Sequence, residues 1–455
     1  MGPASSTAAG IALLVLLARP AADQEFHGKR IALAEPPRSQ LAAGHPVHAL
    51  EKEVSIGGAA FAVAREGDRL RVATEPDLAP SAEITPGKPV RLSWTEGDAK
   101  RSALLTFSRD ETGAWRWWAS EAVQFRIAGE DFRLYDGDGD GLYGDAARDG
   151  WSTGDTDQVM PLAKRIPLGA SLVSLRSIDP DGGRIVAETS ALPGTPSQVA
   201  AVVLVNRLRA AHGLPPAELD GDLSAACTAH ANYLAGNAWD GRSNPHAQDL
   251  GPKGASPAGA AAAVRSVIQD DPPEVALRDC WRTFYHRVGL MGPALDRIGV
   301  NAEHPELTVV DVARGYGEGV RIKGVGVIRE LTGGDWPWTD PVFVPADGSS
   351  GLPVAASPEL PKGPVPDLGS RGTPLMALFR GTSRVTGFKG TLEELRRDGA
   401  APVPVLPADS TLYPFAFGIV PAAPLRPRTS YRAVFTWYSV DEDAGFRRTI
   451  RFRTE

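Results

Sequence analysis

The stretch YDGDGDGLYGDAARDG, residues Tyr135–Gly150, holds the acidic side chains best suited to binding a metal ion. Asp136, Asp138 and Asp140 occupy alternate positions and Gly141 follows them, which is the order of the first half of an EF-hand calcium loop. Carboxylate oxygens are hard ligands of the kind that Ca²⁺ prefers. The spacing therefore indicates a calcium site in this loop.

The second half of the loop departs from that pattern. Ala147 stands at position 12, where an EF-hand has a glutamate that binds through both oxygens. Asp145 and Asp149 are the carboxylates left to close the coordination shell. The alternative is a solvated acidic turn between strands, although carboxylates packed into one loop repel one another without a cation. Both interpretations stay open.

The sequence contains none of the motifs of several common enzyme classes. It has no Gly-x-Ser-x-Gly turn, no His-Glu-x-x-His, no Gly-Lys-Ser/Thr phosphate loop and no Gly-x-Gly-x-x-Gly that opens a helix after a strand. There are two cysteines, Cys227 and Cys280, and both fall on apolar helix faces. A disulfide between packed helices and two buried thiols are equally consistent with that placement.

Composition limits the partners. Of 455 residues, 42% are apolar and 23% charged, as in soluble globular proteins, and the length suggests three folded units. The net charge is -7 and no basic run stands out, so we expect neither a nucleic-acid partner nor an anionic membrane surface.

The N-terminus has the features of an export signal. Residues Gly10–Ala18 are apolar and small residues follow, which predicts a signal peptide over residues 1–22 and a secreted, periplasmic or cell-envelope location. The alternative is a cytosolic protein with an apolar start. No other stretch approaches the ~20 apolar residues of a transmembrane helix, so no membrane span is expected.

The elements that must position these residues change along the chain. Residues 23–190 carry short alternating runs such as RLRVATE and PVRLSWTE, which predict a mainly β domain that includes the acidic loop. Residues 339–455 begin with a Pro-rich linker and end in alternating apolar runs, with a turn at Asp441–Gly445. That pattern predicts a β-sandwich.

Residues 191–338 have a helical period instead. Helices are predicted from Thr195 to Gly213, from Asp222, and from Pro273 through Val288, and three apolar strands follow. Helices followed by strands favour an α+β unit. His230 lies on the apolar stripe of the second helix, where a core histidine bonded to a neighbour is a better interpretation than a metal ligand.

Four pieces of this region resemble the CAP superfamily, the cysteine-rich secretory and pathogenesis-related proteins, in its bacterial branch. They are, in the family's order, VNRLRAAHGLPPAELDGDLSAACTAHANYL, NPHAQ, WRTFYHRVGLMGPAL and RIGV, and they cover roughly a third of the chain. The resemblance implies an α-β-α sandwich in an exported protein. The last region looks like the immunoglobulin-like tail of some bacterial members.

The resemblance also implies a cleft. His246 and His286 match the two histidines that face each other in the family, where some members bind a divalent metal. Two imidazoles and a carboxylate would leave an open position on such a metal. The family's Gly-Glu-Asn segment is missing, however, and Glu274 is the nearest glutamate. A two-histidine site without its glutamate would bind metal poorly.

The function that fits these features is that of an exported, non-catalytic protein that binds a small ligand, glycan, lipid or protein. A metal-assisted, peptidase-like hydrolase that uses His246 and His286 is one alternative, and a structural protein of the cell envelope is another. The ligand does not follow from the fold, because one fold carries many functions.

Overall fold

The structure is a computed structural model, and it describes residues 23–455. The predicted signal peptide lies outside the described residues. Gaps within the described range fall at residues 34–36, 39–47, 51, 57–58, 68, 110–112, 155, 157, 238, 240–243, 249–250, 252, 303, 305, 313–317, 324–325, 332–340, 360–362, 380–382 and 411.

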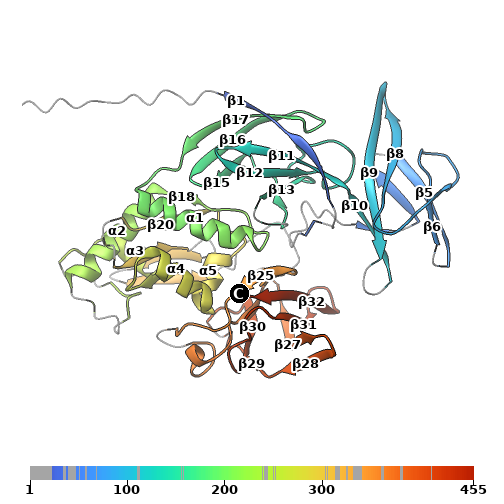
Figure 1. Cartoon of the computed structure of the whole chain (residues 1–455). Coiled ribbons are helices and arrows are strands. Elements are labelled where there is room, and N and C mark those ends of the chain that lie inside the picture. The colour runs from blue at the N-terminus through green and yellow to red at the C-terminus, as the bar shows by residue number, and fades with distance from the viewer. Residues whose placement is uncertain are drawn as a thin grey trace, which may run out of the picture.

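The region predicted as one β domain forms two β units (Figure 1), and each has its own hydrophobic core. The first β unit, residues 48–119, packs two antiparallel sheets around Phe61, Leu92 and Phe107. Its strands are β3 (His48–Ala49), β4 (Glu53–Ile56), β5 (Ala59–Glu66), β6 (Arg69–Val72), β7 (Ala82–Glu83), β8 (Pro89–Glu96), β9 (Ala99–Arg109) and β10 (Trp115–Ala119).

The second β unit, residues 23–33 and 121–191, has sheets in the orders β14-β13-β12-β11-β2 and β1-β17-β16-β15. Phe132 and Trp151 stack in its core at 5.3 Å between ring centroids. The acidic loop joins β12 to β13. The strands are β1 (Asp23–His27), β2 (Lys29–Ala32), β11 (Glu121–Ile127), β12 (Glu130–Tyr135), β13 (Gly150–Thr153), β14 (Met160–Pro161), β15 (Arg165–Leu168), β16 (Ser171–Ile178) and β17 (Arg184–Ala191).

The central region combines five helices with a four-stranded sheet of order β18-β20-β21-β19 and a separate hairpin. Thr195 forms a capping box with Gln198, as the first predicted helix start requires. Asp220 caps the second helix, which begins at Gly221, one residue before the predicted Asp222. The elements are α1 (Pro196–Ala210), β18 (Glu218–Leu219), α2 (Gly221–Gly236), α3 (Pro257–Arg265), β19 (Ser266–Gln269), α4 (Pro273–Arg282), α5 (Tyr285–Met291), β20 (Arg297–Val300), β21 (Thr308–Asp311), β22 (Glu318–Lys323) and β23 (Gly326–Leu331).

Successive residues of β21 show that helices cover both faces of this sheet. Val309 packs in a cluster with α2, whereas Val310 packs in a cluster with α1, α4 and α5. Because side chains alternate across a strand, the sheet lies between two helical layers. The helix predicted from Pro273 through Val288 is broken: α4 ends at Arg282 and α5 begins at Tyr285.

The C-terminal β-sandwich, residues 341–455, has sheets in the orders β24-β26-β30-β29 and β25-β32-β31-β27-β28. The predicted alternation in β31 is confirmed, since Tyr431, Phe435 and Trp437 are buried. The strands are β24 (Val342–Val344), β25 (Ser349–Leu352), β26 (Leu375–Leu378), β27 (Val385–Arg396), β28 (Gly399–Val403), β29 (Val405–Pro407), β30 (Ala416–Pro421), β31 (Ser430–Ser439) and β32 (Ala444–Thr454).

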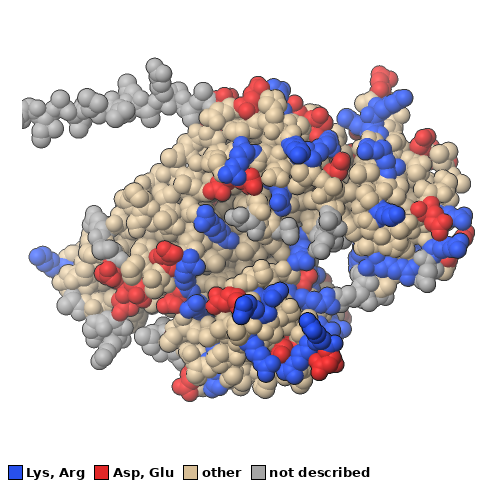
Figure 2. All heavy atoms as spheres, in the orientation of Figure 1, with Lys and Arg blue, Asp and Glu red and all other residues tan. Residues whose placement is uncertain are grey.

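The central region and the C-terminal β-sandwich share one core. Val342 and Met376 of the sandwich pack in the same buried cluster as Trp281 and Phe284 of the central helices. In Figure 1, α4 and α5 lie against the sandwich, and α1 faces the second β unit. Basic and acidic side chains are interspersed on the face shown in Figure 2. Among the described residues, no helix is both long and apolar enough to cross a membrane.

Candidate functional site

His286 lies in the buried junction between the central region and the C-terminal β-sandwich. It is 9% exposed, and its Nδ1 lies 3.4 Å from Thr283 Oγ1. Burial lowers the pKa of His286 to about 4. The imidazole is therefore neutral near pH 7 and is covered by a neighbouring unit.

Glu359, from the Pro-rich segment, faces this histidine. Its carboxylate accepts hydrogen bonds from the backbone N–H groups of Phe284 at 3.1 Å and His286 at 2.9 Å, and Oε1 lies 3.4 Å from His286 Nδ1. Burial raises the pKa of Glu359 to about 7, although the N–H groups oppose the shift. These donors belong to the start of α5, so Glu359 satisfies the unpaired N–H groups of a helix in another unit.

The break between α4 and α5 follows from the same contacts. Thr283 turns its hydroxyl back to the carbonyl of Cys280 at 2.8 Å. The N–H of Phe284 then points to Glu359 instead of continuing the helix. The predicted continuous helix is wrong because a partner from 75 residues further along the chain competes for this N–H.

The other two residues predicted for the cleft, His246 and Glu274, have different contacts. His246 is partly exposed in the loop between α2 and α3, with Nδ1 2.9 Å from the carbonyl oxygen of Ala263. The Glu274 side chain is 73% exposed and pairs with Arg278 on α4 at 3.1 Å. The carboxylate beside His286 is thus Glu359, which the sequence-based reasoning missed.

Two buried arginines fix the segments around His286. Arg287 donates to the carbonyls of Trp281 at 2.5 Å and Pro374 at 2.6 Å, and its guanidinium lies 4.7 Å from the Trp281 ring. Arg209 of α1 donates to the carbonyls of four residues that include Leu290, at 2.7 Å. Burial lowers the pKa of each arginine to about 9, so both remain charged near pH 7.

His230 has the structural role predicted for it. It is fully buried in α2, with Nδ1 2.8 Å from Gln248 Oε1 and Nε2 2.8 Å from the carbonyl of Pro245. These contacts attach the loop that carries His246 to α2. Burial lowers the pKa of His230.

The acidic loop folds around two buried carboxylates. Asp136 accepts hydrogen bonds from the N–H groups of Asp140 at 3.1 Å and Gly141 at 2.7 Å. Asp149 accepts from the N–H groups of three loop residues, at 2.7 to 3.1 Å. Burial raises the pKa of Asp149 to about 7 and that of Asp136 well above its usual value.

Three of the five predicted metal ligands come together. Asp136, Asp138 and Asp149 have ligand oxygens within 4.8 Å of one another, the single such group of His, Cys, Asp or Glu in the described part of the chain. Asp140 and Asp145 lie outside it, and each accepts a hydrogen bond from the N–H two residues ahead. This group of three carboxylates could hold a metal ion.

The acidic loop of the second β unit also contacts the first β unit. Gly139 and Gly141 have φ of +73° and +75°, which favours glycine, and a Cβ at Gly139 would lie 2.8 Å from the Trp117 ring. His48 stacks on Trp117 at 4.2 Å and places Nε2 2.8 Å from the carbonyl of Gly137. A bound ion would therefore stiffen the contact between the first and second β units.

The two cysteines are free thiols in separate hydrophobic clusters, so the structure has two buried thiols and not a disulfide between helices. Cys227 packs with α2 and β21, whereas Cys280 packs with α1, α4 and α5. Burial raises the pKa of both thiols, to about 12 for Cys280. Neither is a reactive thiolate near pH 7.

Residues 202–305 match the family model described as CAP, the cysteine-rich secretory protein family. The chain contains a CAP domain. The match includes His246, Glu274 and His286, whereas Glu359 lies beyond it in the C-terminal β-sandwich. The predicted CAP domain with flanking β sheets is thereby confirmed.

One solved structure similar to this chain is an extracellular protein containing an SCP domain from Bacillus anthracis str. Ames. The two are 11% identical, the alignment covers 58% of this chain and 88% of that chain, and the TM-score is 0.21. At that score the likeness supports no conclusion about this CAP domain or its site. No curated protein matches the chain.

Proposed function

We propose that this protein is an exported, non-catalytic binding protein whose CAP domain is fixed between β units. The observation that carries the proposal is the closure of His286. The imidazole is 9% exposed, is neutral near pH 7 and faces the carboxylate of Glu359 at 3.4 Å. A metal-assisted hydrolase needs an open metal position that substrate can reach.

Two further features favour binding over hydrolysis. Glu274 is exposed and paired with Arg278, so it offers His286 no second carboxylate. Neither His246 nor His286 belongs to a group of three metal-ligating side chains within the described residues. The hydrolase remains an outcome of the experiment below, since His246 sits in an accessible loop.

Export and the C-terminal module complete the proposal. The apolar stretch Gly10–Ala18 acts as a signal that directs the chain to the cell envelope or beyond it. The two-sheet C-terminal β-sandwich is immunoglobulin-like, and its loops and those of the CAP domain offer surfaces for a glycan, lipid, protein or small ligand. A purely structural envelope role would leave all of these surfaces without a ligand.

We also infer that Ca²⁺ occupies the acidic loop through Asp136, Asp138 and Asp149. Three carboxylates within 4.8 Å fit a hard cation with flexible geometry. Asp136 and Asp149 are buried at 4% and 2% exposure, and the third carboxylate, Asp138, pairs with the exposed Arg148 at 3.0 Å. A bound ion would offset the remaining repulsion between the two buried carboxylates and fix the junction between the β units.

The test of non-catalysis compares the purified chain with its His286→Ala and His246→Ala variants. Peptide and ester hydrolysis is measured at neutral pH with Zn²⁺, with Ca²⁺ and with a chelator. We expect no turnover above the buffer rate in any sample. Zn²⁺-dependent hydrolysis that both substitutions abolish would establish the hydrolase instead.

The test of export expresses the chain with and without residues 1–22 in a bacterial host and follows it by cell fractionation. We expect the full chain to leave the cytoplasm in shortened form and the truncated chain to stay inside. Equal cytoplasmic retention of both would contradict the export part of the proposal.

A further inference from the structure

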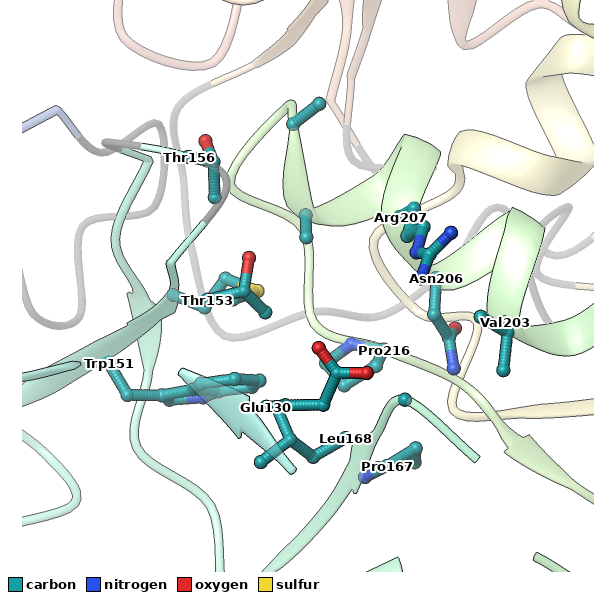
Figure 3. A pocket seen from close by; sticks show the side chains of 14 residues that line it. Glu130, Trp151, Thr153, Thr156, Pro167, Leu168, Val203, Asn206, Arg207 and Pro216 are labelled. Atoms are coloured by element: carbon teal, nitrogen blue, oxygen red, sulfur yellow. The ribbon is translucent and has the colours of Figure 1, made fainter. Parts of the chain in front are cut away.

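A cavity of about 210 Å³ lies between the second β unit and helix α1 of the CAP domain (Figure 3). Strands β12 to β15 form one wall, and α1 with the segment after it forms the other. Its lining includes neither His286 nor the carboxylates of the acidic loop. We propose that this cavity binds a small zwitterion with an apolar side chain, of the size and kind of a free apolar amino acid. This goes beyond the proposed function, which assigns no ligand here.

The apolar part of the cavity is preformed. Trp151, Met160 and Leu168 line it and belong to the core of the second β unit. The Trp151 indole is held by its stack on Phe132. Ala210 of α1 packs in the same core, so the helix and the sheet are fixed to each other at the cavity. An apolar side chain would lose its water there without a change in the walls.

The opposite wall is held by an amide. Asn206 of α1 donates to the carbonyl of Ala217 at 3.0 Å and accepts from the N–H of the same residue at 2.8 Å. These bonds place Pro216 against the cavity. Because the Asn206 amide is used in this way, it shapes the wall and leaves recognition of charge to other residues.

Glu130 supplies the negative group. Its side chain is half-buried, lines the cavity and, in Figure 3, reaches in between Trp151 and the α1 side. Among the described residues no cation or hydrogen-bond donor pairs with its carboxylate. A ligand that fills the cavity removes water from this carboxylate, which is costly unless the ligand brings a positive group. An ammonium group supplies both the charge and the donors.

Arg207 supplies the positive group at the rim. It follows Asn206 on α1, lines the same cavity, and is exposed with no carboxylate partner in the described part of the chain. A ligand carboxylate would face this guanidinium near solvent, while its ammonium faces Glu130. Two opposite charges around an apolar centre therefore select a zwitterion over a simple amine or acid.

The volume limits the size of the ligand. About 210 Å³ is below the ~300–1,000 Å³ of sites that hold drug-sized molecules. Acyl chains of lipids and runs of sugars do not fit, whereas an amino acid with an aliphatic side chain does. Thr153 and Thr156 add hydroxyl groups to the lining, on the side of the β unit.

Calorimetric titration of the full chain with L-leucine tests the proposal, beside 4-methylpentanoate, which lacks the ammonium, and 3-methylbutylamine, which lacks the carboxylate. We expect leucine to bind and each analogue to bind at least tenfold more weakly. No leucine binding at millimolar concentration, or an analogue that binds as well as leucine, would overturn the proposal.

Variants separate the cavity from other surfaces. Glu130→Gln should weaken leucine binding at least tenfold, and Arg207→Gln should weaken it less because Arg207 is more exposed. Val203→Phe, which fills the cavity from α1, should abolish binding, and Ala211→Leu serves as a second filling variant if the first fails to fold. Glu66→Gln, an exposed carboxylate of the first β unit, is the matched control. Leucine binding that persists in a folded filling variant would place the ligand elsewhere and refute the assignment.

Discussion

Replacing Glu359 with glutamine should change how the stability of the CAP domain depends on pH. In the native chain Glu359 and His286 face each other at 3.4 Å in a buried junction. Burial raises the pKa of Glu359 from 4.5 to about 7 and lowers that of His286 from 6.5 to about 4. The two shifts have opposite effects on the free energy of unfolding, so removing one of them reveals the other.

The sign of each effect follows from the protons bound. Glu359 binds more proton in the folded state, so its contribution is present below pH 4.5 and is lost as pH rises through about 7. His286 binds less proton in the folded state, so its contribution is present above pH 6.5 and is lost as pH falls through about 4. Between pH 4.5 and 6.5 the pair holds about one proton in both states, and the two slopes cancel.

The size of each effect on the free energy of unfolding follows from the size of the pKa shift. Each pKa moves by about 2.5 units, and one unit corresponds to about 1.4 kcal/mol. In Glu359→Gln only His286 titrates, so the variant's own free energy of unfolding should rise by about 3 kcal/mol between pH 4 and 6.5. In His286→Gln it should fall by a similar amount, about 3 kcal/mol, between pH 4.5 and 7.

Urea denaturation followed by circular dichroism in the helix band measures this, because the long helices of the described chain belong to the CAP domain. The native chain and both variants are unfolded at a series of pH values from 4 to 8. Glu274→Gln, an exposed glutamate of α4, is the matched control and should run parallel to the native chain. If the two variants show slopes of the same sign, the opposed titration of Glu359 and His286 is refuted.

Three further predictions concern other parts of the chain. Ca²⁺ at a hundred times its dissociation constant should stabilise the β units by about 2.7 kcal/mol in calorimetry. Asp138→Asn should remove most of this stabilisation, whereas Asp140→Asn, outside the three-carboxylate group, should retain it. An equal loss in both variants would contradict the assignment. Arg209→Met should cost about 3–5 kcal/mol in urea denaturation because it leaves buried carbonyls of the CAP domain without donors, and Arg278→Met, on the exposed face of α4, should cost less than about 1 kcal/mol. Thiol titration of the exported chain after unfolding without reductant should give two thiols per chain, and a result of none would show that Cys227 and Cys280 had paired.

Local chemistry explains which parts of the fold were predictable. Thr195 marks a helix start because the side chain that caps a helix is adjacent to it in sequence, and the start predicted at Asp222 lies within two residues of the cap at Asp220 for the same reason. The alternation in β31 predicts its buried face because neighbouring side chains point to opposite sides of a strand. The CAP domain follows from the order of four such local pieces, which the family match confirms over residues 202–305.

The acidic loop was predictable only in part. Its composition points to a metal ion, but not which carboxylates converge. Asp140 and Asp145 each accept a hydrogen bond from the N–H two residues ahead, as in an Asx turn, and lie outside the group. Asp149 joins the group because β13 returns beside β12 and brings it back to Asp136. That pairing between strands is not encoded in the spacing of the aspartates.

The contact of Glu359 with His286 could not be predicted from the sequence for a related reason. Glu359 stands in a Pro-rich segment that reads as a linker, 73 residues beyond His286, and nothing in its own neighbourhood marks it as buried. The segment is fixed because Ser357 contacts Asp279 of α4 at 3.1 Å, while Glu359 takes the N–H groups that begin α5. Its position depends on how the C-terminal β-sandwich packs against the CAP domain, whereas a local sequence pattern predicts the structure of one unit only.

The shared core gives this packing its functional consequence. Phe284 and Trp281 are buried in one cluster with Val342 and Met376, so the CAP domain and the C-terminal β-sandwich cannot separate without exposing both. Arg287 adds a buried bond to the carbonyl of Pro374 across the same junction. Surfaces on the two units therefore keep a fixed geometry, and a partner that spans them meets one preorganised body. His286 belongs to this junction, because the carboxylate that faces it comes from the neighbouring unit.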